Sequence, residues 1–291
     1  MNEGVRIDRD RCTRCGVCTQ VCAACFEEGP DSFPRPLTSP EDCLVCGHCG
    51  AVCPEGAILN EKTESLRTPD LRIPFKYEDL LDLLCGRRSC RAFSGQGVSE
   101  EDVRRLLAAA AQSPNSFNRG NVRYTVITDR KILQAMAELI AKQTVRLTRL
   151  LSHPAGRALF RLFLSKAYRE LEPLLPLLAK MEDPLAAGKD LILYGAPCMI
   201  LVHTPESDGD TGCEDAVYAA ANILSAAQTM MLGTCVIGFV TGPMRSSNAL
   251  RALARIPEGR RVRTTIIVGH PAHSFARAIL RKDPPTDWIT G

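Results

Sequence analysis

The chain is poor in aromatic residues and carries little excess charge. Aromatic side chains make up 5% of its 291 residues, with one tryptophan, and the formal net charge is +3. A nucleic-acid-binding surface usually needs a basic stripe interleaved with aromatic residues, and the sequence has no such stripe. We therefore expect no nucleic-acid partner.

Long hydrophobic runs are also missing. The longest apolar stretch, Leu191–Val202, is interrupted by Gly195 and Pro197, and it is shorter than the roughly 20 residues that a membrane-spanning helix needs. No secretory signal segment precedes the first cysteines. We expect a cytoplasmic protein without a membrane partner.

Catalytic side-chain sets are missing as well. The sequence shows no Ser-His-Asp set, no paired carboxylates and no GxGxxG after a strand, and its five histidines have no metal-binding spacing. His203 and His270 lie at the ends of expected strands. We interpret both as structural histidines, with a place in a pocket wall as the alternative.

Cysteine, in contrast, is abundant and patterned. Two nearly identical runs have the spacing Cys-x-x-Cys-x-x-Cys-x-x-x-Cys, and the second run is followed by Pro54. This spacing suits cuboidal iron–sulfur clusters, because three thiolates wrap one cube and the fourth reaches the other. We assign one [4Fe–4S] cluster to Cys12, Cys15, Cys18 and Cys53, and a second to Cys43, Cys46, Cys49 and Cys22.

Zinc and disulfides are the competing interpretations of these cysteines. Zinc sites do not use a third thiol at the same interval, and disulfides would require a secreted chain. Ala23 stands where the bacterial ferredoxin pattern has proline, and Cys25 is a ninth cysteine that we interpret as a small buried residue. Because exposed clusters are oxygen-labile, we expect the reducing cytoplasm of an anaerobe.

The length predicts a small module joined to a larger domain. We place the cluster module at residues 1–60, a polar linker with two prolines at 61–74, and the large domain at 75–291. A leucine-rich helical insertion is expected at about 150–190. Its central block, residues 154–182, could form a lid, an oligomer contact or additional core helices.

Hydrophobic periodicity predicts an α+β fold for the large domain. Helices are expected at 77–84, after the cap Ser99, from Asp129 to about Leu151, at 215–231 and at 247–255. Strands are expected at 124–127, 198–202, 235–240 and 264–268. In the cysteine module, 5–7 is expected to be a short strand and 57–59 its symmetry mate after the second motif, and the proline-rich stretch 29–36 should be a loop.

An arginine-rich segment follows the first expected helix of the large domain. Arg87, Arg88, Ser89 and Arg91 offer three guanidinium groups and a hydroxyl within five residues. Arginine presents paired donors that match phosphate oxygens, so the segment is a candidate phosphate clamp. A solvated basic turn is the alternative.

The segment also resembles a known family. Residues Arg87–Phe93 have the pattern Arg-Arg-Ser-x-Arg-x-Phe, which is similar to the opening motif of the nitroreductase family of FMN-dependent oxidoreductases. Further similar segments follow in the family's order: Ser113–Asn118, Gly195–Pro197, Leu232–Gly238 and Ile267–Pro271. The resemblance covers residues 75–291, and with its cysteine module the whole chain resembles ferredoxin–nitroreductase fusions of anaerobes.

This resemblance implies an α+β sandwich with a central, mainly antiparallel sheet, and a homodimer with FMN at the subunit interface. The implied FMN contacts are Arg87, Arg88, Ser89 and Arg91 at the phosphate and ribityl end, Pro114, Asn115 and Asn118 from the other subunit, Val236, Ile237 and Gly238 beside the isoalloxazine, and Arg281 at the phosphate. Asn115 replaces the family's usual serine, and Gly120-Asn121-Val122 replaces a frequent Gln-Pro-Trp.

The resulting hypothesis is an FMN-dependent reductase that receives electrons through two [4Fe–4S] clusters from ferredoxin or another low-potential donor. The acceptor would be a small organic molecule such as a nitroaromatic, a quinone or an enone. Since flavin carries out the redox chemistry itself, no protein nucleophile is required. An electron carrier without its own organic substrate is the alternative, and a large domain without flavin is a third possibility.

Overall fold

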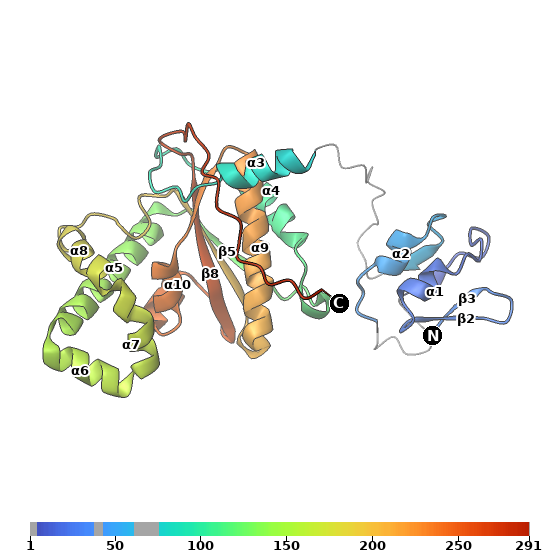
Figure 1. The fold of residues 1–291 in the computed structure, drawn as a ribbon, viewed down its shortest axis with the longest axis horizontal. Coiled ribbons are helices and arrows are strands. Elements are labelled where there is room, and N and C mark those ends of the chain that lie inside the picture. The colour runs from blue at the N-terminus through green and yellow to red at the C-terminus, as the bar shows by residue number, and fades with distance from the viewer. Residues whose placement is uncertain (1–4, 38–42, 61–75, 291) are drawn as a thin grey trace. The chain divides into compact units, whose positions relative to one another are not determined.

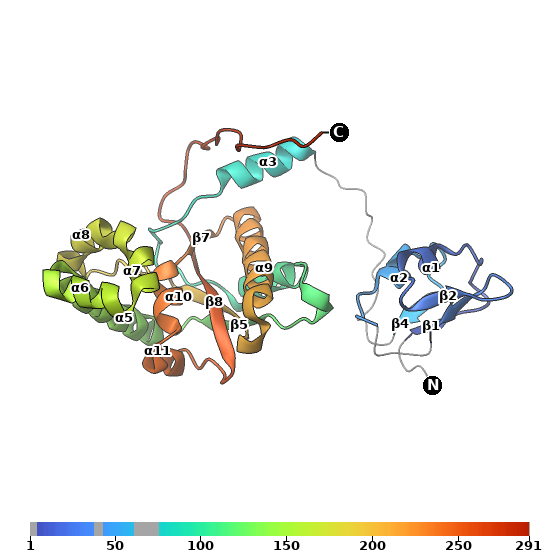
Figure 2. The same cartoon turned by 60° about the horizontal axis from the view of Figure 1, so that its bottom comes forward.

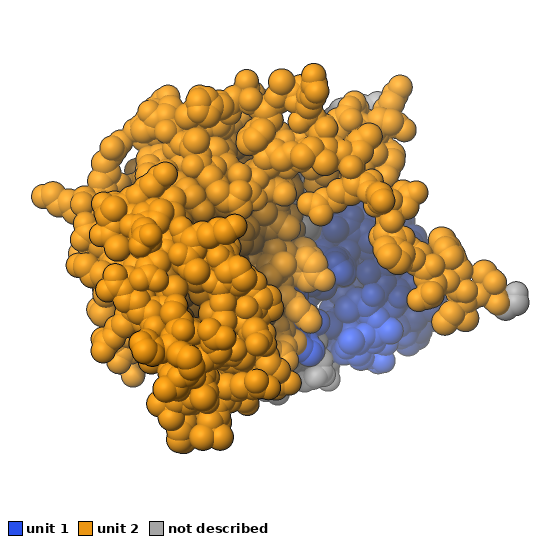
Figure 3. All heavy atoms as spheres, turned by 60° about the vertical axis from the view of Figure 1, so that its left-hand side comes forward, with its two compact units in different colours: residues 1–75, 115–120 blue, residues 76–114, 121–291 orange. Residues whose placement is uncertain are grey.

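The computed structural model describes residues 5–37, 43–60 and 76–290. Its contacts divide the chain into two compact units, coloured separately in Figure 3. The first unit comprises Met1–Phe75 with Asn115–Gly120, and the second comprises Lys76–Pro114 with Asn121–Gly291. The predicted linker at 61–74 lies outside the described residues, so the domain limits 1–60 and 75–291 stay a prediction.

The first unit repeats one short motif twice. Helices α1 (Val17–Val21) and α2 (His48–Val52) each follow a glycine with positive φ, 71° at Gly16 and 76° at Gly47. Glycine adopts this backbone conformation without steric cost, so each loop can turn sharply into its helix directly after a cysteine.

Two antiparallel strand pairs complete the first unit. Strands β1 (Val5–Ile7) and β4 (Ile58–Asn60) pair antiparallel, and they lie within one residue of the two predicted strands. The loop predicted at 29–36 is partly wrong, because β2 (Phe26–Glu28) and β3 (Pro34–Pro36) form a second pair. Prolines are tolerated there because a two-stranded ribbon has only edge strands, on which a missing backbone donor costs little.

The second unit contains a four-stranded sheet in the order β5-β6-β8-β7. All three pairings are antiparallel, and the α+β class with a central antiparallel sheet is confirmed. The strands are β5 (Arg123–Ile127), β6 (Cys198–Pro205), β7 (Gly233–Val236) and β8 (Arg260–Gly269).

Helices cover both faces of this sheet, as Figures 1 and 2 show. They are α4 (Glu100–Ala111), α5 (Arg130–Ser152), α9 (Gly209–Thr229), α10 (Gly238–Met244) and α11 (Asn248–Leu253), whereas α3 (Tyr77–Gly86) contacts α9. The predicted caps are present, since Ser99 Oγ accepts from the Asp102 N–H and the Asp129 carboxylate accepts from the N–H groups of Lys131 and Ile132. Both caps satisfy amides that the first turn leaves unpaired.

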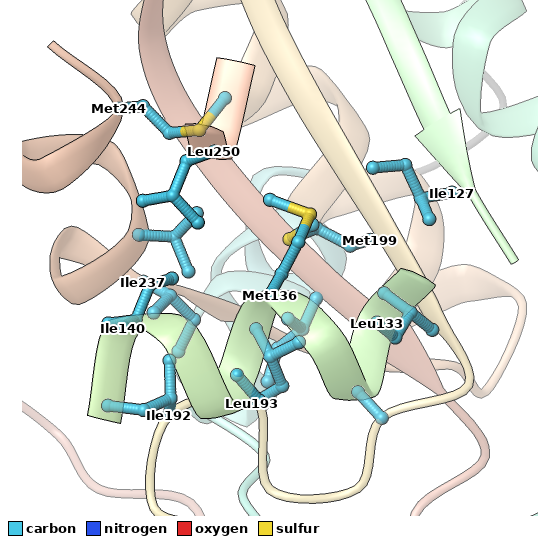
Figure 4. Close-up of a cluster of buried hydrophobic side chains, with 14 of the residues drawn as sticks. Ile127, Leu133, Met136, Ile140, Ile192, Leu193, Met199, Ile237, Met244 and Leu250 are labelled. Carbon is cyan, nitrogen blue, oxygen red and sulfur yellow. The ribbon is translucent and has the colours of Figure 1, made fainter. Parts of the chain in front are cut away.

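The core has two layers because side chains alternate along β6. Met199 and Leu201 pack with α5, α10 and α11, in the cluster of Figure 4. Cys198, Ile200 and Val202 pack instead with α4 and α9. All five are completely buried, so β6 is the central strand that the sequence predicted.

One strand prediction is wrong at its end. The strand expected at 235–240 stops at Val236, and α10 begins at Gly238. The Ile237 N–H donates to the Thr265 carbonyl, and Val240 then faces the core from the helix. The β-branched residues suggested a longer strand, but burial of Val240 is achieved equally well by a helix.

The helical insertion consists of α6 (Pro154–Phe163), α7 (Ser165–Leu171), a 3-10 helix (Glu172–Leu174) and α8 (Leu175–Ala186). In α8, Leu178, Met181 and Leu185 are buried, and the last two belong to the core cluster beneath α5. The prediction of additional core helices therefore holds for α8. Helix α6 buries no side chain. Within the described ranges, no helix combines the length and apolarity needed to cross a bilayer.

Candidate functional site

The first predicted cysteine quartet surrounds one small cavity. Cys12, Cys15, Cys18 and Cys53 all line it, together with the apolar side chains of Ile7 and Ile58. Burial, followed by the neighbouring Cys15 and Cys12 thiols, raises the pKa of Cys18. The Ala57 N–H also donates to Cys53 Sγ at 3.3 Å, the kind of contact that tunes a cluster sulfur.

The second quartet is also drawn together. Burial is the first cause that raises the pKa of Cys49, and the thiols of Cys22, Cys43 and Cys46 raise it further. Cys22 thus lies near Cys49 of the second cysteine run, and its assignment to that quartet stays a prediction. Crowded thiols resist joint ionisation unless a positively charged group holds the thiolates, which is what an iron–sulfur cluster does.

Cys25 lies beside this second quartet. Burial, followed by a hydrogen bond with Cys22 and the charge of Cys43, raises the pKa of Cys25 to about 12. Across the residues with a described placement, no three His, Cys, Asp or Glu side chains are grouped to hold a single metal ion.

Asn118, one of the predicted FMN contacts, belongs to the first unit. Its side-chain amide donates to the carbonyls of Leu44 and Val45 at 3.1 and 3.0 Å. Leu44 and Val45 lie between two cysteines of the second quartet, Cys43 and Cys46, and the Val45 N–H donates to Cys43 Sγ at 3.4 Å. Asn115 accepts a hydrogen bond from the Gly120 N–H and shapes this loop.

In the second unit, the arginine segment is held against the edge of the sheet. Ser89 forms a parallel bridge with Thr234 of β7, and the Cys90 N–H donates to the Thr234 carbonyl at 2.9 Å. Phe93 bridges antiparallel to Pro271, just beyond β8. Residues 89–93 therefore connect the ends of two strands that lie far from them in sequence.

Two glycines permit this close approach. A Cβ atom at Gly233 would lie 2.8 Å from Cys90 Cβ, and one at Gly269 would lie 2.6 Å from Phe93 Cδ1 and 2.7 Å from Pro197 Cδ. Such contacts are too short for real carbon atoms, so only glycine fits. Four of the five motifs from the sequence thereby meet in one place.

Arg88 stands out within the arginine segment. One guanidinium nitrogen, Nη1, donates to the Arg87 carbonyl at 2.7 Å. The other, Nη2, is buried and has no hydrogen-bond partner. An unpaired buried donor on a charged group is costly, and a bound anion such as a phosphate would satisfy it.

The remaining predicted contacts are spread over the second unit. Val236 is 48% exposed at the end of β7, Ile237 is buried, and a Cβ atom at Gly238 would meet open space. Pro114 ends the loop after α4. Arg281 is exposed in the C-terminal segment, where no described hydrogen bond or ion pair connects it to the arginine segment. The structure therefore groups Arg87–Arg91 with β7 but does not bring Arg281 to them.

His203 is a structural histidine in this fold. Arg260 Nε donates to His203 Nδ1 at 2.7 Å, so the imidazole is neutral and its Nε2 donates to Thr125 Oγ1 at 3.1 Å. Burial, together with the charges of Arg260 and Arg123, lowers the pKa of His203 to about 4.

A large cavity of about 870 Å³ adjoins the site and was missed at the sequence level. It lies between α5 and residues 185–197, and Pro197 both lines it and packs beside Phe93. Asp190 shapes its rim by accepting hydrogen bonds from the N–H groups of Ile192, Leu193 and Gly195. The sequence signal for this turn was Gly195-Ala196-Pro197 alone.

Comparisons with known proteins agree with this architecture. Residues 84–270 match the Nitroreductase family. The chain therefore belongs to the nitroreductase family, a family of oxidoreductases, and the family resemblance seen in the sequence is confirmed. A nitroreductase with bound FMN from Bacteroides fragilis shares the fold, with a TM-score of 0.52 at 18% identity over 73% of this chain and 97% of that chain.

The N-terminal part matches ferredoxins. A 57-residue stretch is 35% identical to the ferredoxin of Thermococcus litoralis, covering 20% of this chain and 97% of that protein. A further stretch of 61 residues is 34% identical to an Archaeoglobus fulgidus protein provisionally named NADH dehydrogenase/NAD(P)H nitroreductase, and it spans 21% of this chain and only 35% of that relative. The chain thus combines a ferredoxin-like part with a nitroreductase domain.

Proposed function

We propose that this protein is an FMN-dependent oxidoreductase that takes up electrons through two [4Fe–4S] clusters and reduces a small organic acceptor. The donor is ferredoxin or another low-potential protein, and the acceptor is a nitroaromatic, a quinone or an enone. The observation that carries the proposal is the buried, unpaired guanidinium nitrogen of Arg88 in a segment fixed to the sheet.

The cysteine quartets support the cluster part of the proposal. Each quartet contains three thiols from one loop and one from the other run, and thiols of each quartet lie near one another. Apolar residues cover part of each quartet, since Val5, Ile7, Phe26 and Ile58 pack with Cys18, Cys22, Cys49 and Cys53, whereas Cys15 and Cys46 are exposed. Such a shell limits access of water to a cluster and lowers the local dielectric.

The arginine segment supports the FMN part. Arg87, Arg88, Ser89 and Arg91 would hold the phosphate and ribityl end, and the open space at Gly238 leaves room for the ring beside Val236–Gly238. Bound FMN would supply the redox chemistry that the side chains of this chain lack. Pro114, Asn115 and Asn118 of a second subunit and Arg281 are proposed as further contacts.

A homodimer is part of the proposal. Helix α3 buries none of its side chains, and Tyr77 and Leu84 are 70% and 52% exposed. Trp288 and Leu280 in the C-terminal segment are 83% and 75% exposed. Large apolar side chains in such number are usually covered in a stable assembly, and a second copy of the chain would cover them.

Anaerobic turnover assays test this function. Reduced ferredoxin should support steady reduction of a nitroaromatic or quinone by the purified protein, and the bound pigment should be released as FMN on denaturation. Protein that binds FMN and is reduced by ferredoxin but never turns over an organic acceptor would instead establish the alternative, an electron carrier. Absence of any flavin after anaerobic purification and addition of FMN would refute the proposal.

A second assay separates the donors. Turnover with NADH or NADPH in place of ferredoxin should be slow, and removal of the clusters should abolish ferredoxin-driven turnover. Fast turnover with a nicotinamide nucleotide after cluster removal would show that the clusters do not deliver the electrons.

A further inference from the structure

Helix α6 presents an apolar face to solvent. Leu159, Leu162 and Phe163 are 57%, 75% and 73% exposed, and Leu164 directly after the helix is 51% exposed. At 3.6 residues per turn, positions 159, 162 and 163 lie on one side of the helix. Figures 1 and 2 both place α6 and α7 at the end of the second unit away from α3.

The opposite side of α6 is basic. Arg157 and Arg161 are exposed and lie about half a turn away from Leu159 on the helix. Between Glu138 and Glu170 the sequence has seven basic residues and no acidic one: Lys142, Arg146, Arg149, Arg157, Arg161, Lys166 and Arg169. All seven side chains are exposed.

Few neighbouring carboxylates offset this charge. Glu182 of α8 pairs with Arg149 at 2.8 Å, and Glu172 accepts a hydrogen bond from Tyr168. Asp183 is an exposed carboxylate of α8, and Glu138 of α5 and Glu170 of α7 are the acidic residues of those two helices. The segment from α5 to α7 therefore keeps a clear positive excess around an exposed apolar face.

This combination determines the kind of partner. A second copy of the chain that covered this face with its own α6 would place one basic segment against the other, so like charges would oppose that contact. A bilayer with anionic headgroups accepts both features, because the apolar side chains enter the acyl boundary while the basic ones meet the headgroups.

We infer that α6 is an interfacial helix that docks the protein onto anionic lipid bilayers. We expected no membrane partner because no segment of the sequence is suited to span a bilayer. An interfacial helix lies in the plane of the surface and needs no such segment. The inference does not depend on the cofactors, because the apolar and basic side chains of α6 lie outside the candidate cofactor site and the cavity beside it.

Vesicle flotation of the full-length protein tests this inference. The protein should float with vesicles of phosphatidylglycerol and phosphatidylcholine, bind phosphatidylcholine vesicles at least about tenfold more weakly, and dissociate as salt is raised. The double variant Leu162→Ser/Phe163→Ser should weaken binding about tenfold or more, because two large side chains no longer enter the bilayer. Both positions are exposed, so the fold should be retained.

Matched controls separate docking from general effects. Met231→Ser removes an apolar side chain that is 80% exposed elsewhere and should bind vesicles as the wild type does. Arg161→Gln/Lys166→Gln should weaken binding to anionic vesicles several-fold, whereas Arg105→Gln/Arg255→Gln, with the same charge change at exposed positions outside α5–α7, should not.

Three outcomes would overturn the inference. Wild-type protein that fails to float with anionic vesicles would do so, as would equal binding to phosphatidylcholine alone. The third is a Leu162→Ser/Phe163→Ser variant that binds vesicles normally but changes its sedimentation coefficient, because a second copy of the chain would then cover α6.

Discussion

At the scale of single residues, Arg88 is the side chain whose environment is least satisfied without a ligand. Its buried Nη2 has no partner, and a hydrogen bond to a charged group contributes about 1.5–3 kcal/mol. Replacing Arg88 by Met should therefore raise the dissociation constant for FMN about 10- to 100-fold, measured by quenching of FMN fluorescence on titration with apoprotein. The free energy of unfolding of the apoprotein should not fall, because the orphaned donor is removed as well.

The control for this prediction is Arg105→Met on α4, an exposed arginine outside the segment. It should leave the affinity for FMN unchanged. Equal affinities for wild type and Arg88→Met would mean that the arginine segment is an ordinary basic turn, the alternative that the sequence left open.

His203 makes a second prediction, which concerns pH. Its pKa is about 4 in the folded chain, below the usual 6.5, so the unfolded chain binds a proton between these values while the folded chain does not. The stability that this group contributes is complete above pH 6.5 and is lost as the pH falls toward 4. The loss amounts to roughly 3 kcal/mol.

Urea unfolding of wild type and His203→Gln across this pH range measures the contribution. The difference in unfolding free energy between the two proteins should shrink as the pH falls, because only the wild type loses the stability that the neutral imidazole of His203 contributes. His273→Gln, at an exposed position, is the control and should leave the pH profile unchanged. If the difference in unfolding free energy between wild type and His203→Gln stayed constant with pH, the structural role of His203 would be contradicted.

At the scale of elements, the candidate site depends on how closely residues 89–93 approach β7 and β8. Gly269→Ala would place a Cβ atom 2.6 Å from Phe93 Cδ1 and should lower the free energy of unfolding by about 1–3 kcal/mol. The matched control is Gly97→Ala, where a Cβ atom meets nothing within 4 Å. Thermal unfolding of both variants would show the difference, and equal stabilities would mean that the segment can withdraw from the sheet.

The sequence predicted most of these elements because their signals are local. Helix α5 followed from its cap at Asp129 and its apolar face, and β6 followed from one continuous apolar run. The predicted end of β7 was wrong because Val236 and Val240 favour a strand by their residue type. In the structure, Val240 belongs to helix α10 and packs in the core from there.

The arrangement of the site could not be predicted in the same way. Ser89 and Thr234 are adjacent only because the sheet brings β7 to the arginine segment, and no periodicity records such a contact. The glycines at 233 and 269 were visible, but glycines next to strands are common in turns, and their steric role appears only beside Cys90 and Phe93.

At the scale of the whole molecule, the main untested prediction is which cysteines of the two runs bind which cluster. If each cluster takes three ligands from one run and one from the other, removing Cys22 harms the cluster held by Cys43, Cys46 and Cys49. Protein reconstituted without air should contain about eight iron atoms and eight sulfides for two [4Fe–4S] clusters. Cys22→Ser should lower the iron content and alter the electron paramagnetic resonance signal of one cluster only.

Cys25 provides the control for this experiment, because it lies against Cys22 and Cys43 without belonging to either quartet. Cys25→Ser should keep about eight iron atoms and both spectroscopic signals, since serine retains the volume and polarity of a neighbour that binds no iron. Iron loss in Cys25→Ser with none in Cys22→Ser would mean that the ninth cysteine is the true ligand and that the assignment from spacing is wrong. A wild-type content near seven iron atoms would instead show that one of the two sites holds a three-iron cluster, in which one cysteine of the quartet is spare.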